Sequence, residues 1–212
     1  MSLWKRRGEL MQNDKFMIVN IRDNFQENGA SLERENKLIE TISTFSCPQN
    51  QNVEKFLKEQ AIEFTKKNQS VTYLVFSKDD AKLVGYFTLA SKPIEIKSNI
   101  FSNTMQKKIA RVSEFNQNRH VFHLSAYLIA QFGKNFKEGA NNKITGQELM
   151  KIARNKIKEL QYMLGGMVAF LETEVNEKLL EFYTYKNDFK KFDTRISNSM
   201  EQNQLVQMLV TL

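Results

Sequence analysis

A chain of 212 residues with 41% hydrophobic and 26% charged residues can bury a substantial core, which excludes a wholly disordered protein. It has no evident signal peptide and no apolar run of the roughly eighteen residues that a membrane-spanning helix needs. We therefore expect a protein of the reducing cytoplasm with no membrane partner.

One cysteine, Cys47, excludes an intrachain disulfide and a multi-cysteine zinc site, and two histidines, His120 and His123, leave little for another metal centre. The net charge of +7 suits an anionic partner, but a solvated lysine-rich surface has the same charge.

Residues 1–13 contain a basic cluster without sustained periodicity, and we expect a loosely ordered leader whose first residues can derive from an expression vector. Residues 14–212 show no repeat, low-complexity tract or linker, which predicts a single domain. Its first expected elements are a strand at 16–21 and a helix whose apolar residues recur over 32–42.

A second helix is expected after a turn at Pro48, with Asn52 as its N-cap. Its buried face is predicted to consist of Val53, Leu57, Ala61 and Phe64. The β-rich runs 71–76 (VTYLVF) and 83–90 (LVGYFTLA), joined by a polar turn, predict a β-hairpin. Pro93 is expected to end the second strand or to place the residues after it on a sheet edge.

A helix over 105–112 and a polar link over 115–120 precede the segment 124–192, around which the chain is organised. This segment reads as strand, polar loop, long amphipathic helix, Gly-Gly break, strand and short helix. Two short apolar runs joined through such a helix predict a right-handed crossover and a parallel strand pair. Residues 189–192 (FKKF) and 205–212 (LVQMLVTL) are expected as closing strands, and the last could pair between subunits of a homodimer.

The start of the long helix has the chemistry of an anion site. Thr145 and Glu148 have the spacing of a capping box, and Gly165 and Gly166 are suited to close the helix. Gly146 in the first turn leaves backbone N–H groups open, after a loop rich in Gly, Asn and Lys. Such a loop feeding a helix N-terminus can bind phosphate oxygens, although most helix starts of this kind bind only water.

Over residues 15–212 the chain resembles the GNAT superfamily of acetyl-CoA-dependent N-acetyltransferases, and is similar to a group from low-GC Gram-positive bacteria. Asn176 and Tyr183 have the spacing of the family's strand-Asn-helix-Tyr signature. Phe189 takes the position of the aromatic residue that follows this signature. GYFTLA resembles the family's third strand, and ITGQEL its cofactor loop and helix. The resemblance implies an α/β (α+β) fold with a mixed, mostly antiparallel sheet flanked by helices. A splayed parallel strand pair would form the wedge for acyl-CoA.

Two departures from the family pattern stand out. The phosphate loop, usually Gln/Arg-x-x-Gly-x-Gly/Ala, reads NNKITG over 141–146, and only Gly146 fits. The aromatic after Tyr183 comes one residue later than usual, and Asp188 replaces a glycine, which makes Tyr185 a rival to Tyr183.

The resemblance implies where the cofactor would lie. The pantetheine arm would pair with the backbone of Ala130, Gln131 and Phe132. The pyrophosphate would bind the N–H groups of Lys143, Ile144, Thr145, Gly146 and Gln147. Asn176 would cap the last helix and contact the arm. The alternative for the strand is a closed, fully paired end.

Amine acylation by a thioester needs an amine that has lost its proton, a donor for the oxyanion and a proton for the thiolate. A strand N–H near Gln131 could serve the oxyanion, and the resemblance implies Tyr183 as the general acid, with a core aromatic as the alternative. For the base, His123 has a suitable ordinary pKa, and Glu172 and Glu174 lie on the facing strand. A water chain is an equal alternative, and each side chain has a structural alternative.

The expected function is an N-acetyltransferase that moves an acetyl group from acetyl-CoA, its co-substrate, to a primary amine by direct attack in a ternary complex, without a metal. One alternative is a nucleic-acid-directed protein, including an enzyme that acetylates charged tRNA as some GNAT toxins do. Basic residues are spread through the chain without a recognition motif, so nucleic acid is not favoured. Another alternative is a CoA-binding module without catalysis. The sequence does not identify the acceptor amine.

Overall fold

The computed structural model describes residues 15–25, 31–197 and 202–212, so the expected leader lies outside the described residues. The chain divides into two compact units, the first comprising the chain up to Thr88 together with Gln131–Asn155, the second Leu89–Ala130 together with Lys156–Leu212. The prediction of a single domain stays a prediction. None of the described helices is long and apolar enough to cross a membrane.

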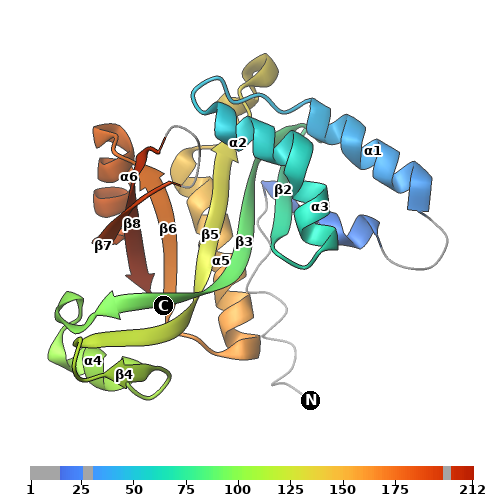
Figure 1. The fold of residues 1–212 in the computed structure, drawn as a ribbon. Coiled ribbons are helices and arrows are strands. Elements are labelled where there is room, and N and C mark those ends of the chain that lie inside the picture. The colour runs from blue at the N-terminus through green and yellow to red at the C-terminus, as the bar shows by residue number, and fades with distance from the viewer. Residues whose placement is uncertain (1–14, 26–30, 198–201) are drawn as a thin grey trace, which may run out of the picture. The chain divides into compact units, whose positions relative to one another are not determined.

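Strands of the described residues belong to one mixed sheet. They are β1 (Phe16–Asn20), β2 (Val71–Ser77), β3 (Leu83–Lys97), β4 (Glu114–Asn116), β5 (Val121–Lys134), β6 (Val168–Glu174), β7 (Lys190–Ile196) and β8 (Gln204–Thr211). Their order is β1-β2-β3-β5-β6-β8-β7, and β4 pairs with β5 (Figure 1). The pairs β1–β2, β4–β5, β6–β8 and β7–β8 are antiparallel, whereas β5 and β6 are parallel. The predicted fold class and the predicted parallel pair are confirmed.

The helices include the predicted long helix, which begins at Gly146. They are α1 (Ser31–Ser43), α2 (Gln51–Lys55), α3 (Ala61–Lys66), α4 (Asn103–Ile109), α5 (Gly146–Leu164) and α6 (Glu177–Asn187). A π-helical segment, η2 (Phe56–Gln60), joins α2 to α3, and the 3-10 segment η4 (Lys137–Asn142) precedes α5.

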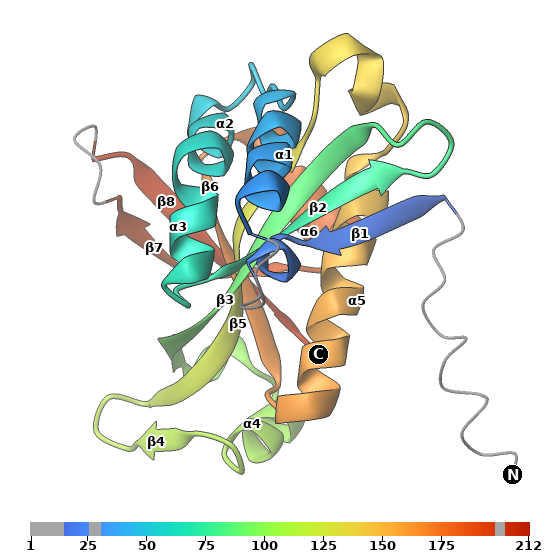
Figure 2. The ribbon, with the colours of Figure 1, turned by 90° about the vertical axis from the view of Figure 1, so that its right-hand side faces the viewer.

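In the first unit, α1, α2 and α3 pack on the strands β2 and β3, and Figure 2 shows the three helices side by side. The core between helices and strands comprises Ile21, Leu38, Ile42, Phe45, Cys47, Val53, Phe56, Leu57, Ala61, Leu74, Leu83 and Tyr86.

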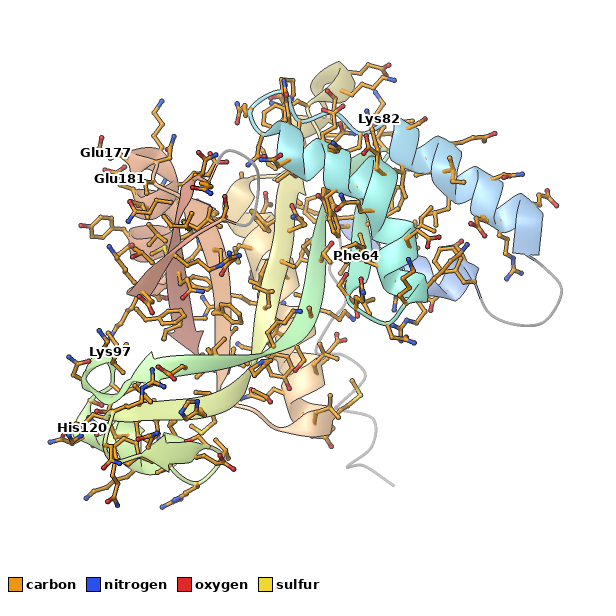
Figure 3. The ribbon with its side chains drawn as sticks, in the orientation of Figure 1. Phe64, Lys82, Lys97, His120, Glu177 and Glu181 are labelled. Carbon is orange, nitrogen blue, oxygen red and sulfur yellow. The ribbon has the colours of Figure 1, made fainter. Side chains whose placement is uncertain are left out.

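Two predictions about the helices of this unit are corrected. Phe64 is 37% exposed (Figure 3), unlike the other three predicted face residues. The N-cap of α2 is Asn50, whose Oδ1 accepts from the Val53 N–H at 3.1 Å, because the turn after Cys47 leaves Asn50 extended and Asn52 already helical.

The second unit has its own core, which comprises Ile96, Phe101, Ile109, Phe122, Leu124, Ala126, Val168, Phe170, Phe192 and Leu209. Pro93 does not end its strand, because β3 continues to Lys97, and the φ of proline is compatible with extended backbone. The expected polar link contains a strand instead: β4 pairs with the start of β5, with Glu114 opposite His123. The expected helix over 105–112 ends earlier, at Ile109.

The end of α6 places Asp188 in a backbone conformation that suits glycine. Asp188 adopts a left-handed conformation, with φ 61°, and its N–H donates to the Tyr183 carbonyl. The Phe189 N–H donates to the same oxygen at 3.0 Å. This is a helix stop that favours a residue without a Cβ atom.

We expect Asp188→Gly to stabilise the protein by about 0.5–1 kcal/mol, because glycine adopts this conformation without steric cost. Calorimetric melting should show a rise in Tm of roughly 1–4 °C for a chain of this size. Asp188→Ala is the matched comparison and should lower the Tm. An equal or lower Tm for the glycine variant would show that the Asp188 side chain itself stabilises the turn.

Candidate functional site

The parallel pairing between β5 and β6 is short and ends before either strand does. It consists of Tyr127 with Ala169, Leu128 with Phe170 and Ile129 with Leu171. Beyond Leu171, β6 continues to Glu174, and its partner there among the described strands is β8, on its other side. Ala130, the next residue of β5, has no partner on β6. The backbone groups of the second unit that face the gap are therefore open to an extended ligand, as in the predicted splayed pair.

The opposite end of this pair is held together by the Gly-Gly break. The Tyr127 hydroxyl donates to the Gly165 carbonyl, and the Gln161 side-chain amide donates to the Gly166 carbonyl at 2.9 Å. Gly166 has φ 97°, and a Cβ atom there would lie 2.9 Å from the Tyr127 ring. The close approach of ring and backbone thus fixes the closed end.

In the first unit, the loop between β5 and α5 is fastened by Lys134, the last residue of β5. Its ammonium donates to the Asn141 carbonyl at 2.8 Å and to the Ile144 carbonyl at 3.0 Å. Burial lowers the pKa of Lys134, and the nearby Glu148 carboxylate opposes that shift. Sequence reasoning missed this lysine, although its place at the end of a strand and before the predicted anion-binding loop was a usable signal.

The predicted capping box is present at the start of α5. The Thr145 N–H and hydroxyl both donate to Glu148 Oε2 at 2.8 Å, and the Glu148 N–H donates to Thr145 Oγ1 at 3.1 Å. These bonds from Thr145, the backbone bond foremost, lower the pKa of Glu148 against the effect of burial, and the positive charges of Lys15 and Lys134 contribute in the same direction. The carboxylate is therefore ionised at neutral pH.

The cap changes which amides a phosphate could use. Of the five predicted N–H groups, that of Lys143 donates to the Ala140 carbonyl at 3.1 Å and that of Thr145 to Glu148. Those of Ile144, Gly146 and Gln147 have no acceptor among the described residues. The Lys143 ammonium lies 3.1 Å from the Asp80 carboxylate, so it is not a free cation.

In the second unit, α6 presents the signature residues. Asn176 is the N-cap, as predicted, and its Oδ1 accepts from the Leu179 N–H at 3.2 Å. Tyr183 is 8% exposed, whereas Tyr185 is 81% exposed, and Glu177 and Glu181 lie on the outer side of the helix (Figure 3).

The Tyr183 ring packs edge-on against Phe182 and Phe189, with centroids 5.1 and 6.0 Å away. Burial raises the pKa of Tyr183 to about 12. The phenol therefore keeps its proton at neutral pH, as a proton donor must.

Of the predicted bases, Glu172 is engaged in a half-buried ion pair. Arg195 donates to its two oxygens at 2.6 and 2.5 Å, and Gln207 donates at 2.7 Å. Burial, the largest influence, would raise the pKa of Glu172, but the hydrogen bonds from Arg195 and Gln207 and the Arg195 charge outweigh it and lower that pKa. A carboxylate so held is a weak base. Glu174, at the end of the same strand, is exposed.

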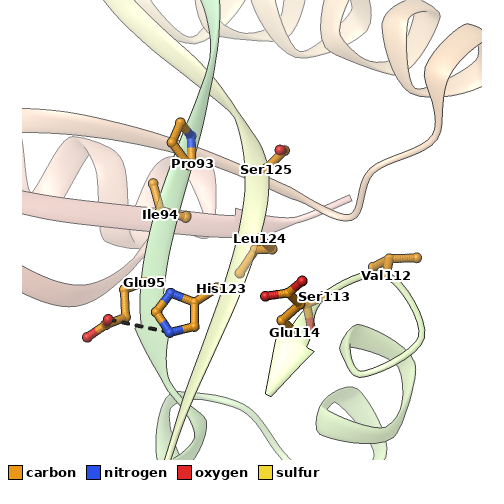
Figure 4. Close-up of a pocket in the computed structure, with 9 residues that line it drawn as sticks. All are labelled: Pro93, Ile94, Glu95, Val112, Ser113, Glu114, His123, Leu124 and Ser125. Atoms are coloured by element: carbon orange, nitrogen blue, oxygen red, sulfur yellow. Dashed lines mark ion pairs between the residues drawn. The ribbon is translucent and has the colours of Figure 1, made fainter. Parts of the chain in front are cut away.

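His123 lies elsewhere on β5, seven residues before Ala130, which corresponds to roughly 23 Å of extended strand. It lines an open hollow of about 650 Å³, with its Nε2 3.7 Å from Glu95 (Figure 4). Glu95 is in turn held by both terminal nitrogens of Arg119 at 2.8 and 2.7 Å. The structure therefore does not bring His123 to the open end of the strand pair.

No group of three potential metal ligands occurs within the described residues. No known family profile matches the sequence, and no curated protein matches it.

Solved structures do match over nearly the whole chain. AtaT complexed with acetyl-methionyl-tRNAfMet is 15% identical, with 90% of this chain and 93% of that chain covered and a TM-score of 0.57. A tyrosine-to-phenylalanine mutant of KacT is 18% identical, with 93% and 95% covered and a TM-score of 0.59. AtaTR bound with AcCoA is 14% identical, with 93% and 94% covered and a TM-score of 0.54. At these identities the similarity establishes the fold, which agrees with the fold that the sequence predicted.

Proposed function

We propose that this chain is an acetyl-CoA-dependent N-acetyltransferase of the GNAT type, which transfers the acetyl group to a primary amine by direct attack in a ternary complex. The observation that carries the proposal is the early end of the β5–β6 ladder after Ile129 and Leu171. A pantetheine arm has amide groups that can pair with such an unpaired edge in the manner of an added strand. Solved structures of the same fold, including AtaTR bound with AcCoA, support this choice of ligand.

Most of the proposed contacts come from the residues that precede and follow the loop between β5 and α5 in the chain. The arm would pair with the backbone of Ala130, Gln131 and Phe132, with Asn176 beside it. The pyrophosphate would bind the N–H groups of Ile144, Gly146 and Gln147, because the first-turn amides of α5 favour negative charge. Acetyl-CoA is a co-substrate here and no metal is required.

In the proposed reaction the amine nitrogen attacks the thioester carbon, and the C–S bond breaks as the tetrahedral intermediate collapses. A strand N–H near Gln131 would stabilise the oxyanion, and Tyr183 would deliver a proton to the departing thiolate. Glu172 is held by Arg195, His123 lies far along β5, and Glu174 is an exposed carboxylate at the strand end, so we assign proton removal from the amine to water.

The experiment is a transfer assay with acetyl-CoA and a panel of amines, read by release of free CoA thiol, together with calorimetric titration of acetyl-CoA. The proposal expects saturable binding and amine-dependent thiol release. Saturable binding without release for any amine would favour the non-catalytic CoA-binding module. Absence of binding would refute both.

A second candidate is acetylation of the amino group of a charged tRNA. The net charge of +7 would assist capture of an anionic substrate, and AtaT, a neighbour in fold, has been captured with acetyl-methionyl-tRNAfMet. Aminoacyl-tRNA should then be acetylated far faster than the free amino acid, with a steep salt dependence. Equal rates for both acceptors would reject this candidate. The grouping with low-GC Gram-positive bacteria, the homodimer and the cytoplasmic location stay predictions.

We expect Glu172→Gln to lower stability rather than activity. Loss of a charged partner from this pair costs about 1–3 kcal/mol, whereas loss of a general base would lower kcat by roughly 10²–10⁴. Because the pKa of Glu172 is lowered on folding, its carboxylate stabilises the fold above the ordinary value of 4.5, and this contribution is lost as the pH falls through the folded-state pKa. The wild type should therefore lose more stability on acidification than the variant does.

Urea unfolding at neutral and acidic pH, with kcat measured in parallel, checks this expectation. Glu181→Gln, on the exposed side of α6, is the matched control and should change neither quantity. A hundredfold fall in kcat confined to Glu172→Gln would restore Glu172 as the base.

A further inference from the structure

One peptide group at the start of α5 is hydrogen-bonded to a cationic side chain through its C=O and to an anionic side chain through its N–H. The carbonyl oxygen of Ile144 accepts from the Lys134 ammonium at 3.0 Å. The N–H of the same peptide group, which belongs to Thr145, donates to the Glu148 carboxylate at 2.8 Å. In a trans peptide the C=O and N–H point in opposite directions, so Lys134 and Glu148 lie at opposite edges of the peptide group.

This geometry places a negative charge on the side that an anionic ligand must approach. The open amides of Gly146 and Gln147 come directly after Thr145 in the first turn of the helix. A phosphate oxygen directed at this turn would compete with the Glu148 carboxylate for the Thr145 N–H. It would also meet the charge of Glu148, which is ionised at neutral pH.

We propose that Glu148 acts as a resident anion that occupies the place of a cofactor phosphate oxygen on the Thr145 amide and so weakens the binding of acetyl-CoA. The inference rests on the proposed function, because it concerns the same cofactor site. When the pyrophosphate binds the amides of Ile144, Gly146 and Gln147, the carboxylate leaves the Thr145 N–H, and a phosphate oxygen takes its place as one further contact. Lys134 remains on the carbonyl side and holds the loop in both states.

Glu148→Gln isolates the charge. Glutamine at this position of a capping box still offers an oxygen to the Thr145 N–H, so the helix cap is kept while the negative charge is lost. The variant should bind acetyl-CoA roughly two- to fivefold more tightly, which is the usual effect of one charge at a helix N-terminus. The gain should shrink as salt is added.

Calorimetric titration of two ligands provides the test. Acetyl-CoA carries the phosphates, whereas S-acetylpantetheine has the same thioester arm without them. Glu148→Gln should tighten binding of the first and leave binding of the second unchanged. Glu63→Gln, an exposed first-turn glutamate of α3, is the matched control and should bind both ligands as the wild type does.

Equal or weaker binding of acetyl-CoA by Glu148→Gln would overturn the inference and leave the proposed function intact. An equal gain for both ligands would also overturn it, because the effect would not come from the phosphates. Absence of acetyl-CoA binding in every variant would remove the proposed function as well. Glu148→Ala removes the competing oxygen as well as the charge, and it should show at least the same gain for acetyl-CoA and none for S-acetylpantetheine.

Discussion

Replacing Tyr183 by phenylalanine is expected to lower kcat by roughly 10²–10⁴, the usual contribution of a positioned general acid. The ring stays in place between Phe182 and Phe189, so only the hydroxyl and its proton are lost. Binding of acetyl-CoA should change little, because the buried ring still fills the same volume. The measurement is steady-state kinetics of thiol release, paired with calorimetric titration of acetyl-CoA.

Tyr185→Phe is the matched control, since Tyr185 lies on the same helix and is 81% exposed. It should retain wild-type kcat. The opposite pattern, with activity lost in the Tyr185 variant and kept in the Tyr183 variant, would reassign the acid to Tyr185. Unchanged activity in both variants would mean that the thiolate leaves without a protein acid.

Replacing Lys134 by methionine is expected to raise the KM for acetyl-CoA by roughly tenfold or more, because hydrogen bonds from a charged donor contribute about 1.5–3 kcal/mol each. Methionine has a similar length and shape but cannot donate to the Asn141 and Ile144 carbonyls. The loop before α5 would lose the two hydrogen bonds that hold it in place, and the site would lose a positive charge. The value of kcat at saturation should stay close to that of the wild type, because Lys134 does not touch the reacting atoms.

Lys151→Met, at an exposed position of α5, is the control and should leave both constants unchanged. A fall in kcat without a change in KM would contradict the assignment of Lys134 as a positioning residue. Lys134→Met and Glu148→Gln should shift acetyl-CoA affinity in opposite directions, because the first removes a positive charge and the second a negative charge beside the same peptide group.

The parts of the fold that depend on local periodicity could be predicted from the sequence. The capping box at Thr145, the helix stop at Gly165 and the parallel pairing of the apolar runs on either side of α5 are consequences of residue spacing alone. Some of the predictions that were wrong concern single residues in locally ambiguous positions. Asn50 and Asn52 both suit a helix start, and the turn after Cys47 decides between them.

Contacts between distant residues could not be predicted in this way. Glu172 and Arg195 are 23 residues apart, and only the register of β6, β8 and β7 brings them together. Likewise, β4 has only three residues, too few to predict a strand until the pairing of β4 with β5 is known. The sequence therefore supplied candidates for the base but not the ion pair that makes Glu172 unsuitable.

Amide hydrogen exchange with and without acetyl-CoA tests the central claim most directly, because the claim concerns backbone groups that would hydrogen-bond to the cofactor. We predict new protection in two places, the strand segment Ala130, Gln131 and Phe132 and the first-turn amides of Gly146 and Gln147. Unchanged exchange in both places under saturating acetyl-CoA, or protection confined to other segments, would contradict a cofactor bound at the open end of the strand pair.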